Sequence, residues 1–263
     1  MKILVIPDVH LKPWIFDKAD EILQSNKDID TFVSLGDIAD DWDKRNNLNL
    51  YEETYDRLID MVKKYPKSIF CYGNHDISYI WQRHETGYST AARNIVVNKI
   101  SELERILGED RIGFAKKIDN CIFSHAGLCQ TFIDWYVPEK YKQSEDMTLR
   151  YINEGMYSSE LWIDISPIWL RPQEQCINMY EAEKYLQIVG HTPISEIIYD
   201  ASENVLSVDT FSTYRDGTPI GTQSFAVVDT VAKEWEFIPT QEKDINIDES
   251  IEDSFDDCIE ERE

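Results

Sequence analysis

The chain has 263 residues, of which 42% are hydrophobic, so it can bury the core of one large domain or of a domain with an appendage. Its formal net charge of −24 argues against nucleic acid as a partner, because binding a polyanion normally needs a basic surface. The first apolar run is too short for a signal peptide, and no stretch approaches the roughly 18 apolar residues of a membrane helix. We therefore expect a cytoplasmic protein without a membrane segment.

Strands and helices alternate in the first half of the sequence. Apolar runs predict strands over residues 2–8, 31–37 and 68–74, and amphipathic periods predict helices over 16–26 and 51–65. This βαβαβ order is typical of a layered α/β domain.

The second half predicts a helix, a hairpin and then a helical insert. The helix is expected over 89–108, and the hairpin over 111–127 turns at Asp119-Asn120. Residues from about 130 to 185 are rich in Trp and Tyr at helical spacing, which is typical of packing side chains. Strands are then expected over 186–192, 194–200, 204–210 and 224–229.

The acidic residues concentrate at the end of the chain. From Glu242 on there are 11 acidic and two basic residues, a net charge of −9. This composition predicts a solvated, disordered tail over 242–263 after one domain over 1–241, and a docking segment is the alternative.

The five cysteines form no CxxC pair and no even framework, so reduced thiols are expected. Cys71 and Cys121 lie in apolar runs and are expected in the core.

Side chains that can bind metals or move protons follow five of the predicted strands. In a layered α/β sheet the carboxyl ends of the strands lie along one edge, where such folds bind ligands. The GNHD sequence alone could be only a polar turn, but five strand ends together predict a site. Four of the five histidines are included; the fifth, His84, is expected on the surface or at a pocket rim. The candidates are Asp8 and His10 in PDVH, Asp37 and Asp40 in GDIAD, Asn74, His75 and Asp76 in GNHD, His125 in SHAG, and His191 in GHTP.

Oxygen and imidazole ligands without thiolate suit divalent ions such as Mn²⁺, Fe or Zn²⁺. The candidate ligands would overcrowd one four-coordinate site, but they can serve two ions if a carboxylate bridges them. Two ions about 3.5–4 Å apart can clamp the attacking and the leaving oxygens of a displacement at phosphorus. The residues therefore predict hydrolysis of phosphoric esters.

The ordered motifs DxH, GDxxD, GNHD, SHAG and GHTP resemble those of the calcineurin-like metallophosphoesterase superfamily, from residue 8 to about 210. This resemblance implies an α/β fold, a four-layered αββα sandwich with two mixed central sheets. It implies two divalent ions, with Mn²⁺ expected first and Fe or Zn²⁺ as alternatives. The implied ligands are Asp8, His10 and a bridging Asp37 at one ion, and Asp37, Asn74, His125 and His191 at the other.

The resemblance also implies which groups act on the substrate. A hydroxide bridging the ions would attack phosphorus, and His75 would protonate the leaving oxygen as general acid while Asp40 orients it. Arg171 in WLRP resembles an Arg that grips phosphate in prokaryotic protein-phosphatase-like relatives, with a surface Arg beside a Pro turn as the alternative. Arg83 and Arg150 are weaker candidates.

The closest resemblance is to the prokaryotic and phage branch of phosphoprotein and diadenosine-tetraphosphate phosphatases. Pro193 stands where many phosphodiesterases carry a second His in GHxH, and the VDT sequence ending at Thr210 also fits this branch. Two positions depart from it, because Asp41 replaces the Arg of GDxxDRG and Asp76 replaces a common Glu. These departures leave the substrate open.

We therefore predict a binuclear-metal phosphatase of phosphomonoesters, with phosphoserine and phosphothreonine in proteins among its substrates. One alternative is a hydrolase of nucleotides or dinucleoside polyphosphates. The other is a metal-binding scaffold that recruits partners through its acidic tail. The presence of His75 and Asp40 favours an enzyme, because a scaffold has no need of a positioned acid.

Overall fold

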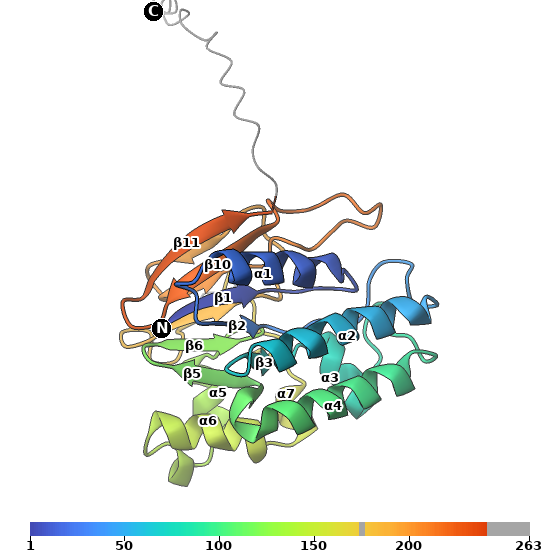
Figure 1. Ribbon diagram of the computed structural model, residues 1–263. Coiled ribbons are helices and arrows are strands. Elements are labelled where there is room, and N and C mark those ends of the chain that lie inside the picture. Colours follow the sequence, from blue (N-terminus) through green and yellow to red (C-terminus); the bar gives the residue numbers. More distant parts are fainter. Residues whose placement is uncertain (174–176, 241–263) are drawn as a thin grey trace, which may run out of the picture.

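The computed structural model in Figure 1 describes residues 1–173 and 177–240, and its core is a pair of facing sheets. The six-stranded sheet has the order β11-β10-β1-β2-β3-β4, and the five-stranded sheet has the order β5-β6-β7-β9-β8. The predicted tail lies outside the described residues, so its state and the boundary at residue 241 remain predictions. The strands are β1 (Lys2–Ile6), β2 (Thr31–Ser34), β3 (Ile69–Cys71), β4 (Ile112–Gly113), β5 (Ala115–Ile118), β6 (Cys121–Ser124), β7 (Leu186–Val189), β8 (Ile198–Asp200), β9 (Val205–Ser207), β10 (Ser224–Asp229) and β11 (Glu234–Pro239).

Both sheets are mixed, as expected. Strands β1 to β4 are parallel to one another, whereas β10 pairs antiparallel with β1 and β11 pairs antiparallel with β10. In the second sheet β6, β7 and β9 are parallel, with β5 and β8 antiparallel at the edges. The parallel strands of each sheet therefore end at a common edge.

Alternating side chains divide the core into the space between the sheets and the faces under the helices. On β1, Ile3 and Val5 belong to the cluster between the sheets, whereas Leu4 and Ile6 belong to the cluster beneath the helices. Successive side chains of a strand point to opposite faces, so a continuous apolar run marks a strand buried on both sides. Cys71 and Cys121 lie in the cluster between the sheets, where the sequence predicted core residues.

Helices form the two outer layers. Figure 1 shows α1, α2 and α4 side by side along the six-stranded sheet, with α5, α6 and α7 beyond β5 and β6. This arrangement confirms the predicted αββα sandwich, and α5 to α7 form the predicted insert. The helices are α1 (Trp14–Ser25), α2 (Leu48–Lys64), α3 (Asn74–Trp81), α4 (Arg93–Arg111), α5 (Gln130–Tyr136), α6 (Glu145–Glu154) and α7 (Ser158–Leu161), with a 3₁₀ turn at Glu139–Tyr141.

Helix α2 shows how local sequence sets these elements. The side chain of Asn47 caps its first turn by accepting a hydrogen bond from the amide of Leu50, and Lys63 and Lys64 complement the dipole of its last turn. Its buried face includes Tyr51 and Tyr55, which lie one turn apart.

Three elements differ from the sequence expectations. Helix α3 begins at Asn74, directly after Gly73, because the carboxylate of Asp76 caps its first turn by accepting from the amide of Gly73. The stretch over 111–119 is split, so that β4 joins one sheet and β5 the other. Strand β11 was not predicted, and it is the exposed edge strand of the larger sheet. In the described part of the chain, no helix combines the length and apolarity needed to cross a bilayer.

Gln187 on β7 ties the insert to the smaller sheet. Its fully buried side chain accepts a hydrogen bond from the amide of Leu128 at 2.9 Å, and it donates to the carbonyls of Leu128 at 2.8 Å and Tyr180 at 3.1 Å. We expect Gln187→Leu to lower the free energy of unfolding by about 1–3 kcal/mol, because it leaves buried polar groups unpaired. Denaturant titration measures this loss, and the exposed Gln24→Leu variant should stay within about 0.5 kcal/mol of the parent. Equal midpoints for all three proteins would contradict this prediction.

Candidate metal centre

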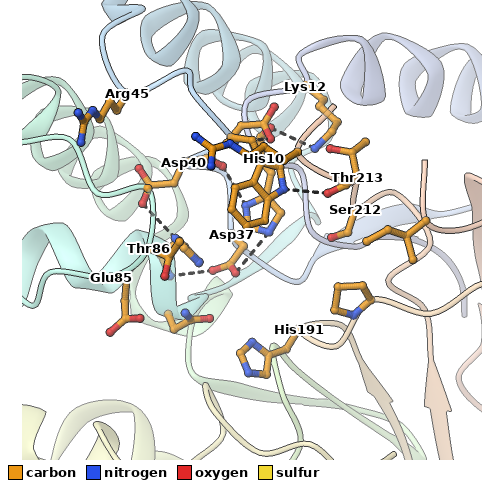
Figure 2. Close-up of a pocket in the computed structure, with 18 of the residues that line it drawn as sticks. His10, Lys12, Asp37, Asp40, Arg45, Glu85, Thr86, His191, Ser212 and Thr213 are labelled. Atoms are coloured by element: carbon orange, nitrogen blue, oxygen red, sulfur yellow. Dashed lines mark hydrogen bonds and ion pairs between the residues drawn. The ribbon is translucent and has the colours of Figure 1, made fainter. Parts of the chain in front are cut away.

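The predicted strand ends meet at one place, because backbone hydrogen bonds join the loops that follow them. The carbonyl of Asp37, after β2, accepts from the amides of Val9 and His10, after β1, at 3.0 and 2.8 Å. The amide of His191, after β7, donates to the carboxylate of Asp8 at 3.0 Å. Both sheets therefore contribute loops to a single site (Figure 2).

Four of the candidate residues have a backbone conformation that non-glycine residues rarely adopt. The φ angles are 45° at His10, 48° at Asp37, and 65° at both Asp40 and His191. Such left-handed conformations cost roughly 1–3 kcal/mol each and cluster at functional sites. The side-chain directions at this site are thus held by the fold against local preference.

Glycines leave the room that the carboxylates occupy. A Cβ atom at Gly73 would lie 2.0 Å from Oδ1 of Asp37, and one at Gly190 would lie 2.2 Å from Oδ1 of Asp8. Any side chain at either position would therefore displace a carboxylate.

Two groups of candidate ligands share Asp37. The first contains Asp8, His10 and Asp37, the second contains Asp37, His125 and His191, and the ligand atoms of each group lie within 4.8 Å of one another. Figure 2 shows Asp37 in the middle of the labelled side chains, between His10 and His191. A shared carboxylate is the arrangement needed to hold two ions next to each other.

Hydrogen bonds set the tautomers of two histidines. Nδ1 of His10 lies 3.0 Å from the carbonyl of Asp40, and Nδ1 of His125 lies 2.9 Å from the carbonyl of Leu35. Nδ1 donates to these oxygens, which leaves the lone pair of Nε2 facing the site. Burial lowers the pKa of both imidazoles, to about 3 for His125, so both rings stay in the neutral form that binds metals.

The polar atoms of the second group converge on Nε2 of His125. Nε2 of His125 lies 3.0 Å from Oδ1 of Asn74 and 3.4 Å from Oδ2 of Asp37, although all three atoms are acceptors. Nδ1 of His191 also lies 3.0 Å from the same Nε2 of His125. A divalent cation would satisfy these lone pairs, so the residues present fit a metal.

The buried carboxylates also favour a cation. Burial, followed by repulsion from Asp209 and Asp37, raises the pKa of Asp8 well above its ordinary value. Burial likewise raises the pKa of Asp37 to about 8. Close, buried carboxylates are costly in ionised form unless a positive charge lies among them.

His75 and Asp40 form a pair beside the ligand groups. Nδ1 of His75 lies 3.0 Å from Oδ2 of Asp40, and His75 belongs to neither ligand group. Burial acts to lower the pKa of His75, but the charge of Asp37 and the hydrogen bond and charge of Asp40 outweigh it and raise the pKa to about 9. The imidazole is therefore favoured in its protonated, acidic form.

A cavity of about 810 Å³ opens over this site. Arg171 lines it, and its Nη1 donates to Oγ1 of Thr192 at 3.2 Å. The weaker candidates lie elsewhere, because Arg83 is over the ring of Trp162 and Arg150 pairs with Glu154. The residues of the cavity wall that matter for chemistry are His10, Lys12, Asp37, Asp40, Trp42, Arg45, Asn74, His75, Glu85, Trp169, Arg171 and His191.

Several cavity residues escaped the sequence analysis. Trp42 donates from Nε1 to the carbonyl of Thr213 at 2.9 Å, and Arg215 forms a bidentate ion pair with Asp43 at 3.0 and 2.9 Å. These contacts join loops some 170 residues apart, so no local pattern indicates them. Two cavity residues lie close to motifs, Lys12 two positions after the DxH motif and Trp169 within the WLRP sequence.

The chain matches the family of calcineurin-like phosphoesterases over residues 1–217. It therefore belongs to this family and is a hydrolase. Among solved structures it is similar to a cold-active protein-tyrosine phosphatase of the psychrophile Shewanella sp., with a TM-score of 0.53 and 16% identity over 90% of this chain and 80% of that chain.

A second similar structure is a protein serine/threonine phosphatase from Saccharomyces cerevisiae, with a TM-score of 0.52 and 13% identity over 92% of this chain and 81% of that chain. At such identities these likenesses show a shared fold. No curated protein matches the chain significantly.

We expect Mn²⁺ to raise the melting temperature more at about pH 8.5 than at about pH 6, because the ion must displace the proton that Asp37 holds below its raised pKa. The metal-free protein should show the opposite trend. A carboxyl with a raised folded-state pKa stabilises the fold at low pH, and this contribution is lost as pH rises through about 8. Melting curves with excess Mn²⁺ and with chelator test both trends, and equal metal-induced rises at the two pH values would contradict them.

Proposed function

We propose that the protein is a binuclear-metal phosphatase that hydrolyses phosphomonoesters, including phosphoserine or phosphothreonine in proteins. The observation that carries this proposal is the pair of ligand groups that share Asp37 beside the His75–Asp40 pair. Family membership supports a phosphoric ester as the substrate.

Asp8, His10 and Asp37 would hold one ion, and Asp37, Asn74, His125 and His191 would hold the other. Oxygen and imidazole donors without thiolate favour Mn²⁺, with Fe or Zn²⁺ as alternatives. When bound, two such ions would neutralise charge on the phosphoryl group and supply an activated water.

His75 would donate a proton to the leaving oxygen. It lines the cavity, and because Nδ1 is bonded to Asp40, Nε2 is the nitrogen available to a substrate. A protonated imidazole held in one orientation suits a leaving group that departs as an alkoxide, which is the leaving group of a phosphoserine.

Arg171 would bind the phosphoryl oxygens that the ions do not reach. Its guanidinium lies in the cavity wall, and its planar fork can bind two oxygens of one phosphate. Surface carboxylates more than about 8 Å away are largely screened at physiological salt, so the acidic body need not repel a small ester. The same acidity disfavours long nucleic acids.

Hydrolysis of nucleotides or dinucleoside polyphosphates is the second candidate. The rings of Trp42 and Trp169 both line the cavity and offer faces on which a base could stack. A metal-binding scaffold is a weaker alternative, because it gives no reason for the His75–Asp40 pair.

A substrate panel tests the proposal and separates the candidates. The purified protein is stripped of metal, resupplied with Mn²⁺, and given a phosphoserine peptide, a dinucleoside tetraphosphate and a bis-aryl phosphodiester. We expect the peptide to be hydrolysed fastest. Faster cleavage of the tetraphosphate would favour the second candidate. No hydrolysis of any of the three compounds by protein with two bound ions would favour the scaffold.

His75→Ala should leave the metal content near that of the parent and lower turnover of an alkyl phosphate by about 10²- to 10⁴-fold, the range for a lost general acid. Turnover of an activated aryl phosphate should fall far less, because its leaving group needs little protonation. His84→Ala is the matched control, since His84 stacks on Tyr88 outside the cavity wall. Unchanged turnover of the alkyl ester would refute the assigned role.

Arg171→Ala should lower kcat/KM for phosphomonoesters by about 10- to 100-fold, because it removes a charge-assisted hydrogen bond to phosphate. Arg171→Lys keeps the positive charge but loses the planar, two-pronged guanidinium, so its kcat/KM should lie between those of Arg171→Ala and the parent. Arg83→Ala, outside the cavity, should match the parent in steady-state kinetics. Equal values for Arg171→Ala and the parent would contradict the assignment.

A further inference from the structure

The carboxylate of Asp40 is held by more than its contact with His75. It is 2% exposed, and its Oδ1 accepts hydrogen bonds from the hydroxyl of Tyr51 at 2.9 Å and from the hydroxyl of Tyr79. Its Oδ2 faces Nδ1 of His75. Two tyrosines thus occupy one carboxylate oxygen, and the imidazole pairs with the other.

The tyrosines come from two helices that enclose Asp40. Tyr51 lies in the first turns of α2, and Tyr79 lies on α3 four residues after His75, so His75 and Tyr79 share one helix face. Both rings are fully buried, and they meet edge to face with centroids 6.4 Å apart.

Further contacts fix the hydroxyl of Tyr79. It accepts a hydrogen bond from the amide of Ser89 at 2.9 Å, and its ring stacks on Tyr88 with centroids 4.4 Å apart. With that acceptor position filled, the hydroxyl proton is directed to Asp40. Burial raises the pKa of both Tyr51 and Tyr79, so the hydroxyls remain protonated donors.

We propose that Tyr51 and Tyr79 are positioning residues that set the orientation of the general acid. By binding Oδ1 of Asp40 they fix the plane of its carboxylate, and Oδ2 then holds the ring of His75 with Nε2 toward the cavity. This inference rests on the proposed function, because it concerns the acid step of that reaction. Neither tyrosine is assigned to touch the substrate.

The carboxylate needs this support because its terminal torsion is intrinsically soft. The χ2 angle of Asp has broad minima, so a single contact with His75 leaves it free to rotate. For metal-ligating residues, loss of the outer hydrogen bond that orients the ligand typically costs about 10- to 100-fold in metal affinity or activity, and we expect a loss of the same size here. The loss should fall on substrates that depend on protonation of the leaving oxygen.

Tyr55 provides a matched control within the same helix. It is fully buried one turn after Tyr51 and donates to Oδ1 of Asp76 at 2.9 Å. The carboxylate of Asp76 accepts hydrogen bonds from the backbone amides of Ile38 and Gly73, so it holds the backbone rather than the ring of His75. Tyr55→Phe therefore removes the same kind of buried bond without touching the Asp40 contact.

The test compares the full-length Mn²⁺-loaded parent with Tyr51→Phe, Tyr79→Phe, the double variant and Tyr55→Phe on an alkyl phosphate and on p-nitrophenyl phosphate. For the double variant we expect kcat on the alkyl ester to fall about 10- to 100-fold, while kcat on the aryl ester falls less than about threefold and KM stays unchanged. Tyr55→Phe should keep the parent's ratio of the two rates. Equal losses on both esters, or an unchanged ratio in the double variant, would overturn the inference.

A second readout does not depend on activity. In Zn²⁺-loaded protein labelled with ¹⁵N-histidine, which avoids the paramagnetic broadening of Mn²⁺, the Nδ1–H resonance of His75 is identified by its loss in His75→Ala. This resonance should broaden or shift in the double variant and stay in place in Tyr55→Phe. If the resonance stays in place in every tyrosine variant, the positioning role is refuted, even if the parent hydrolyses neither ester. If the parent is inactive on both esters but the resonance shifts in the double variant, only the proposed phosphatase function is refuted.

Discussion

The structure depends on the carboxylate of Asp37 more than on any other single group. Its Oδ2 lies 3.8 Å from Nε2 of His10 and 3.4 Å from Nε2 of His125, and its Oδ1 accepts from the amide of His75 at 2.9 Å. One residue thus contacts three strand-end loops. The backbone around it follows from this role, since Asp37 takes a left-handed conformation and Gly73 leaves room for its oxygens.

The site combines groups that would repel one another without a cation. Asp8 and Asp37 are buried carboxylates with raised pKa values, and burial lowers the pKa of the His10 and His125 imidazoles and keeps them neutral. Such a site stores unfavourable electrostatic energy that a divalent ion relieves, which couples metal binding to the stability of the fold. The negative charge of the whole chain matters less, because screening confines the effective field to the immediate surroundings of the site.

The sequence predicted those site residues that directly follow a buried strand. A parallel strand buried on both faces reads as an apolar run, and the polar residue after it must lie at the carboxyl edge of the sheet, so Asp8, Asp37 and His125 could be assembled in advance. Helix α3 was missed because its first turn is made of the same residues, Asn74 to Asp76, that serve equally well in a polar turn. Strand β11 was missed because one face of an edge strand is exposed and its pattern is weak.

The contacts around the acid could not be foreseen at all. Tyr51 falls in a predicted amphipathic helix and no motif singles out Tyr79. Only the tertiary structure, in which the two rings meet edge to face, brings their hydroxyls to Asp40. The ion pair of Arg215 with Asp43 is likewise a product of tertiary structure. Residues at strand ends can be predicted from the local sequence, whereas hydrogen bonds between helices depend on how those helices pack.

We propose that Asp37 joins two metal sites into one centre. The most direct measurement is the number of Mn²⁺ ions bound per chain, by calorimetry with elemental analysis, in the parent and in Asp8→Asn, His191→Ala and Asp37→Asn. We expect two ions in the parent, one in each of the first two variants, and weakened binding of both ions in Asp37→Asn. Loss of a single ion in Asp37→Asn, with the other bound as tightly as in the parent, would contradict it.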